Sequence, residues 1–110
     1  MIKLLSLIIE TGDPSLAGRC YELAAKYAMK HGGTYTIARV NSNGKSFNHA
    51  FVIEGDKIYD PEYDKHYPKQ KYLKSLNIKN FALQIDGPEG IALWVLKNKS
   101  WPYPEKFNIH

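Results

Sequence analysis

The spacing of apolar residues along the first half of the chain predicts one helix followed by antiparallel strands. Apolar side chains recur at helical spacing from Ser15 to His31, and the Gly32-Gly33 pair that follows is typical of a helix end. Residues 34–40, TYTIARV, have the β-branched and aromatic character of a strand, and NSNGK has turn chemistry. Residues 49–60, HAFVIEGDKIYD, predict a β-hairpin about a Gly-Asp turn.

The second half of the chain has a weaker pattern. A short helix is predicted after Pro68, residues 80–86 favour another strand, and Gly87-Pro88 indicates a turn. Periodicity leaves residues 89–99 open as a helix or a strand, and it leaves residues 2–9 open in the same way. We therefore expect an α+β fold in which the N-terminal helix, which carries the only cysteine, packs on a small antiparallel β-sheet.

The turn of the predicted hairpin sets which side chains share a face. With Gly55-Asp56 as the two loop residues of a type II′ turn, Glu54 faces Lys57 and every later cross-strand pair keeps that register. Because side chains alternate between faces, His49 and Asp60 then become diagonal neighbours within about 7–8 Å. A loop one residue longer, without a bulge, would place the two on opposite faces of the sheet.

The chemistry-bearing residues follow one another in a suggestive order. Cys20 lies in the predicted helix, His49 opens the first strand of the hairpin, and Asp60 closes the second. This order is typical of a Cys-His-Asp catalytic triad. Cys20 would be the nucleophile, and His49 would hold its thiolate and later protonate the leaving group. Asp60 would fix the tautomer and orientation of the imidazole ring.

The same residues have structural interpretations. Cys20 lies on the apolar stripe of its helix, and free cysteine is among the most buried residue types. If the helix begins at Pro14, Cys20 falls nearly two turns in, where the helix dipole no longer stabilises a thiolate. If the helix begins at Gly18, Cys20 lies in the first turn, where the dipole does stabilise a thiolate. His49 and Asp60, taken singly, are typical of strand and turn positions. Their joint order and the hairpin register favour the triad.

Residues near Cys20 and several aromatic residues are candidates for binding a substrate. Backbone N–H groups around Arg19, Cys20 and Tyr21 are candidate oxyanion-hole donors, and no side-chain donor is evident. The predicted substrate-binding side chains are those of Arg19, Tyr21, Tyr59 and Trp94, although aromatic residues also commonly serve the core.

Two segments of the chain carry a family resemblance. GRCYELAAKYA, followed by a strand and then by NHAFVIEGDKIYDPEY, resembles the transglutaminase-like and papain-like cysteine hydrolase superfamily. The similarity is greatest to small bacterial and phage-type proteins with a cysteine-bearing helix and an H-A-W/F-V…V/I-Y-D-P hairpin. It spans roughly residues 18–63, and it implies a papain-like or transglutaminase-like core.

The resemblance also implies an activity. Carried over by position, it assigns Cys20 as nucleophile, His49 as general base and acid, and Asp60 as the orienting carboxylate. The implied chemistry is hydrolysis or acyl transfer at a peptide, isopeptide or glutamine side-chain amide. The substrate would be a protein or peptide, and the enzyme would act as a thiol protease, an amidase or a transglutaminase-like enzyme. Papain-like enzymes carry a glutamine shortly before the cysteine, and TGDPSLAG has none, so the transglutaminase-like branch is favoured.

The cysteine count bears on metals and on the cellular compartment. A single cysteine excludes an internal disulfide and a multi-cysteine zinc cluster, and it fits a reducing, cytoplasmic location. A zinc site of Cys20, His49 and Asp60 is the metal alternative, but no paired ligand spacing supports it, and we expect no metal or cofactor.

Length, charge and hydropathy leave two further function classes open. With 110 residues, the chain is expected to be a single domain over residues 1–110. The apolar N-terminal run ends at Glu10 without a cleavage site, and no segment reaches the length of a membrane span. The net charge is +4, with one lysine cluster at residues 65–74. The alternatives are a binding module for nucleic acid or an acidic protein, and a small inhibitor or regulator from a mobile element.

Overall fold

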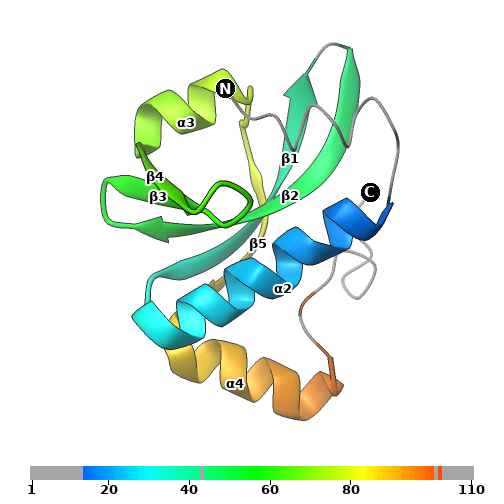
Figure 1. Ribbon diagram of the computed structural model, residues 1–110, viewed down its shortest axis with the longest axis vertical. Helices are drawn as coiled ribbons and strands as arrows, with labels where there is room; N and C mark the ends of the chain where they lie inside the picture. Colours follow the sequence, from blue (N-terminus) through cyan, green and yellow to red (C-terminus); the bar gives the residue numbers. More distant parts are fainter. Residues whose placement is uncertain (1–13, 43, 101, 103–110) are drawn as a thin grey trace.

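The computed structural model describes residues 14–42, 44–100 and 102, so the open prediction for residues 2–9 lies outside the described residues. The elements, in chain order, are α2 (Pro14–His31), β1 (Thr34–Ser42), β2 (Lys45–Glu54), β3 (Lys57–Asp60), β4 (Lys65–Pro68), α3 (Lys69–Ser75), β5 (Phe81–Asp86) and α4 (Gly87–Asn98). The strands form a five-stranded antiparallel sheet in the order β4-β3-β2-β1-β5 (Figure 1). The predicted α+β class and the helix at Cys20 are confirmed.

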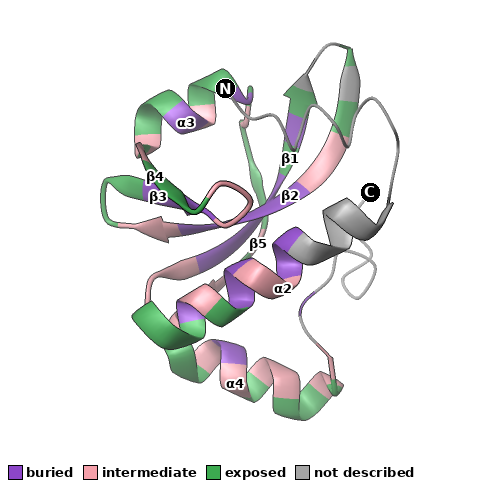
Figure 2. Cartoon of the chain, in the orientation of Figure 1, coloured by how far each residue is buried: buried purple, intermediate pink, exposed green. Residues whose placement is uncertain are grey.

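Helices cover both faces of the sheet. Helices α2 and α4 lie together on one face, and α3 lies on the other (Figure 1). The sheet therefore separates two apolar cores. The first includes Ala24 and Ala28 of α2 with Ile91 of α4, and the second includes Tyr72 and Leu76 beside the opposite face. Buried positions concentrate on strands β1 and β2 and on the inner side of α2, as Figure 2 shows.

Helix α2 begins at Pro14, so Gly18 does not interrupt it. Proline suits the first turn because its missing N–H has no helical acceptor there. Cys20 consequently lies in the second turn, where the helix dipole gives a thiolate little support. Ala24, Ala25 and Ala28 are fully buried along this helix, and their small side chains allow α2 to lie close to the sheet.

The structure decides what the pattern left open in the second half of the chain and adds one element. Residues 89–99, left open by periodicity, belong mainly to helix α4. At the predicted turn of Gly87-Pro88 the chain passes directly from β5 into α4, with Gly87 at a φ of 63° and Pro88 in the first helical turn, where proline is tolerated. The short edge strand β4 was not predicted, since its four residues carry no alternating apolar pattern.

The predicted hairpin register is confirmed. Glu54 pairs with Lys57, and the register continues to the pair of Val52 with Tyr59. Gly55 has a φ of 63°, the left-handed value that the first loop residue of a type II′ turn requires. Within the described part of the chain, no helix is both long enough and apolar enough to cross a membrane.

Candidate active site

The three residues predicted as a triad meet where β3 ends. His49 Nε2 lies 3.4 Å from Asp60 Oδ2, and both side chains are buried. Cys20 Sγ, a ring nitrogen of His49 and a carboxylate oxygen of Glu62 all lie within 4.8 Å of one another. The predicted contact between His49 and Asp60 is confirmed, and His49 lies beside both the Cys20 thiol and the Glu62 carboxylate.

The short pairing of β3 with β2 makes this meeting possible. Paired residues of these strands run only from Val52 to Glu54 on β2, so no β3 residue pairs with the part of β2 that carries His49. The chain turns after Asp60, and the Glu62 N–H donates to Asp60 Oδ1 at 3.0 Å. Beside His49 the sheet has no paired β3 residue, and helix α2 contributes Cys20 there.

Asp60 has three hydrogen-bond donors. Besides His49 Nε2 and the Glu62 N–H, the Tyr72 hydroxyl donates to Asp60 Oδ2 at 2.8 Å. Burial alone raises the pKa of Asp60, but the bond with His49, the positive charge of His49 and the other two donors bring it below its usual value. Asp60 is therefore a carboxylate at neutral pH, oriented from helix α3 through Tyr72.

His49 is held in its charged form. Burial lowers the pKa of His49, but attraction to the negative charge of a Cys20 thiolate and hydrogen bonding with Asp60 raise it well above its usual value. Since Nε2 faces Asp60, Nδ1 points to the other side of the ring, where Glu62 Oε1 lies 3.7 Å away. An imidazolium in this position suits an ion pair with the thiolate.

Glu62 is the site residue that the sequence reasoning missed. Its side chain is 1% exposed, although an acidic residue in a turn after a strand normally faces solvent. Burial raises the pKa of Glu62 to about 7, with attraction to His49 and a hydrogen bond with Cys20 opposing the rise and repulsion from Asp60 adding to it. Only its position two residues after Asp60 could have drawn attention to it in the sequence.

Two of the predicted substrate-binding residues, Tyr21 and Tyr59, make contacts within the fold. The side chain of Arg19 lies outside the described part of the structure. Tyr21 is buried and donates to the Asn48 carbonyl at 3.2 Å, which ties α2 to β2. Tyr59 is largely buried and stacks on the ring of Tyr27 with 3.7 Å between centroids. Their role in substrate binding stays a prediction.

The other predicted parts of the substrate site can also be located. Trp94 lies half-buried in α4, the helix that packs beside α2, and its substrate contact stays a prediction too. The backbone N–H groups of residues 19–21 lie beyond the first turn of α2, where regular helix geometry directs each N–H to a carbonyl four residues earlier. They are therefore poor oxyanion donors, which corrects the expectation from sequence.

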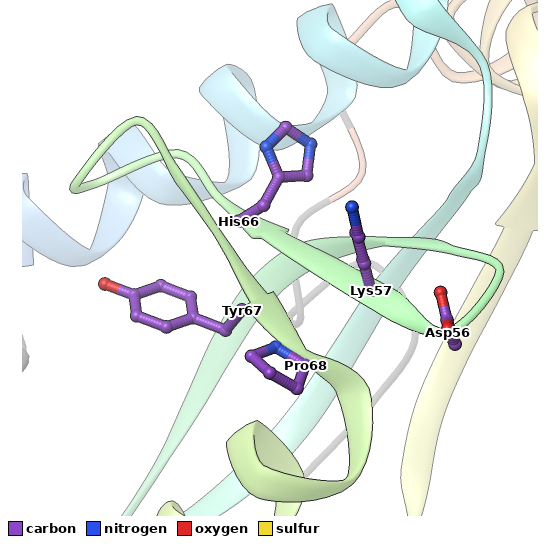
Figure 3. Close-up of a pocket in the computed structure, with 5 residues that line it drawn as sticks. All are labelled: Asp56, Lys57, His66, Tyr67 and Pro68. Carbon is purple, nitrogen blue, oxygen red and sulfur yellow. The ribbon is translucent and has the colours of Figure 1, made fainter.

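A surface pocket lies apart from the triad. It has a volume of about 280 Å³ and is lined by Asp56, Lys57, His66, Tyr67 and Pro68, from the turn before β3, from β3 and from β4 (Figure 3). None of the triad residues lines it. Cys20 is only 1% exposed, so its Sγ does not face bulk solvent in this structure.

Within the described residues, the donor set that can hold a metal ion is Cys20, His49 and Glu62. This set differs in one residue from the zinc alternative considered from sequence, because Glu62 takes the place of Asp60, which hydrogen-bonds His49 Nε2. Comparison of the chain with protein-family models, with curated proteins and with solved structures finds no match.

Proposed function

We propose that this protein is a thiol-dependent hydrolase or acyltransferase in which Cys20, His49 and Asp60 act as a catalytic triad on a papain-like or transglutaminase-like core. The observation that carries the proposal is the position of His49. This buried imidazole has Asp60 at Nε2 and the Cys20 thiol on its other side, which is the arrangement that thiol catalysis requires.

The chemistry follows from these contacts. The Cys20 thiolate attacks the carbonyl carbon of an amide, and a C–S bond forms. His49 gives its proton to the leaving nitrogen as the C–N bond breaks, and a thioester remains on Cys20. Water or an amine then attacks the thioester, His49 takes up the proton, and the thiolate leaves. Asp60 keeps His49 Nε2 protonated throughout, and Tyr72 holds Asp60 in place.

The rate of Cys20 alkylation by iodoacetamide, measured against pH, tests the proposal. With chelator present, we expect native Cys20 to react with a midpoint at least one pH unit below the value of about 8.5 for a free thiol. His49→Ala should abolish that depression, because it removes the cation that stabilises the thiolate. His66→Ala is the matched control, since His66 is an exposed histidine paired with Glu54 and should leave the profile unchanged.

Two results would contradict the proposal. Cys20 that reacts only after denaturation would be a core residue, and the binding-module and regulator alternatives would then lead. A low midpoint that persists in a folded His49→Ala variant would show that the imidazole does not activate the thiol.

A further inference from the structure

We propose that Cys20, His49 and Glu62 form a Zn²⁺ site whose occupation masks the Cys20 thiol. The inference deepens the proposed function, since it concerns the same thiol, but the metal site does not require the triad to be active. The bound ion would be a reversible inhibitor of the thiol chemistry rather than its cofactor.

The donor atoms are close to the spacing that zinc needs. Metal–ligand bonds of about 2.0–2.3 Å in a tetrahedral site put ligand atoms about 3.3–3.6 Å apart. His49 Nδ1 and Glu62 Oε1 are already 3.7 Å apart, and Cys20 Sγ lies within 4.8 Å of the donors of both residues. A closure of roughly 1 Å by side-chain rotation completes three ligand positions.

The atoms that would bind the ion are the ones left unsatisfied. His49 Nδ1 and both carboxylate oxygens of Glu62 are buried and have no hydrogen-bond partner within bonding distance. Both side chains are 1% exposed, so bulk water does not solvate these atoms. Buried polar atoms without partners are rare and costly, and several that converge on one point indicate a missing ligand.

The residues behind His49 are arranged as in a metal site. A metal-binding histidine commonly donates its second ring N–H to a carboxylate, which fixes the tautomer and raises the basicity of the ligand nitrogen. Asp60 Oδ2 is that acceptor for His49 Nε2, and the Tyr72 hydroxyl and the Glu62 N–H hold Asp60 in turn. His49 is therefore already oriented with Nδ1 toward the other two donors, and binding of the ion displaces the proton that Nδ1 carries in the imidazolium.

Charge and ligand type select the ion. A Cys20 thiolate and a Glu62 carboxylate carry two negative charges in a buried site, and a divalent cation neutralises both. Thiolate and imidazole ligands favour zinc over magnesium or calcium, which prefer oxygen. A Sγ atom bonded to zinc shares electron density with the cation, so it is a weaker nucleophile toward a carbonyl carbon than the free thiolate.

Zinc titration of the chelator-treated full chain, in competition with a chromophoric chelator, tests the site. We expect one Zn²⁺ per chain, and binding at least about tenfold weaker in Glu62→Gln. Glu54→Gln is the matched control, because Glu54 pairs with the exposed His66 outside the cluster, and its affinity should be unchanged. Co²⁺ in place of Zn²⁺ should give a thiolate-to-metal charge-transfer absorption that Cys20→Ser removes.

Zinc binding that is absent, or that Cys20→Ser and Glu62→Gln leave unchanged, would overturn the metal site. If Glu62→Gln does not fold, lack of the charge-transfer absorption in the native chain overturns it equally. The two proposals fail separately. A reactive thiol that depends on His49 without zinc binding removes only the metal site, whereas zinc binding by a chain whose metal-free thiol is unreactive removes only the enzyme.

Discussion

At the scale of single residues, Glu62 is the most informative side chain in the molecule. Burial of the Glu62 carboxyl group is a liability in the fold, because its charged form loses hydration that attraction to His49 and hydrogen bonding with Cys20 only partly offset. Burial raises its pKa from 4.5 to about 7, so the protein loses stability when Glu62 ionises. A side chain that costs stability in this way is more easily explained by function than by folding.

The cost of Glu62 can be measured through its pH dependence. Because the pKa of Glu62 is raised on folding, the folded state holds the proton more tightly, and stability falls as pH rises from 4.5 to about 7. We expect the free energy of unfolding of Glu62→Gln, relative to the native chain, to increase by roughly 3 kcal/mol between pH 4.5 and pH 8. Urea unfolding with chelator present measures it.

The Glu54→Gln variant is the control for this series. Glu54 is 28% exposed and hydrogen-bonds His66 and Tyr27, so its replacement should not reproduce the rise seen for Glu62→Gln. A Glu62→Gln variant whose relative stability stays flat across this range would show that Glu62 ionises as readily in the folded chain as in the unfolded one.

At the scale of elements, the joint between α2 and β1 brings Gly33 close to β2. Gly32 and Gly33 both have positive φ, at 88° and 92°, and they turn the chain from helix into strand. A Cβ on Gly33 would lie 2.8 Å from Val52 Cγ1 and 3.0 Å from the Ile53 carbonyl oxygen. The Gly33 carbonyl also accepts the Gly87 N–H at 2.8 Å, which ties this joint to the start of α4.

The two glycines form a matched pair for testing this joint. Gly32→Ala meets nothing within 4 Å and should cost about 1 kcal/mol of stability, the penalty for a side chain at positive φ. Gly33→Ala carries the same penalty and the clash with Val52 and Ile53, so we expect a loss of more than about 2 kcal/mol. Equal losses in thermal unfolding would show that the close approach of Gly33 to β2 is not required.

At the scale of the whole molecule, one sheet joins two cores. Ile91 lies in the core under α2 and α4, and Leu76 lies in the core under α3, with the central strands contributing to both. The site depends on this arrangement, because Cys20 comes from one layer and Tyr72, which holds Asp60, comes from the other. Loss of either core should therefore disturb the site.

Substitutions in the two cores test whether the chain unfolds as one unit. Ile91→Ala and Leu76→Ala should each cost about 2–5 kcal/mol. Each should shift a single unfolding transition that coincides by circular dichroism and by tryptophan fluorescence. Leu93→Ala, at a side chain 66% exposed, should change stability by less than about 0.5 kcal/mol. Two separate transitions would mean that the layers fold independently.

The local pattern of the sequence determined the elements whose signals are short-range. The periodicity of residues 15–31 and the Gly-Asp turn at residues 55–56 were enough to predict α2, the hairpin and its register, because helical spacing and turn geometry depend on near neighbours. The register in turn placed His49 beside Asp60 before any tertiary contact was known.

The tertiary structure alone decided what surrounds that pair. Tyr72 reaches Asp60 from α3, which lies on the opposite face of the sheet from α2. Glu62 turns inward because β3 stops at Asp60. The close approach of Cys20 to His49 joins residues 29 positions apart, from helix α2 to the middle strand β2, which no local pattern describes. Packing of distant segments produces these contacts. It also determines the charges of His49 and Asp60 and leaves His49 Nδ1 and the Glu62 oxygens without hydrogen-bond partners at normal distance.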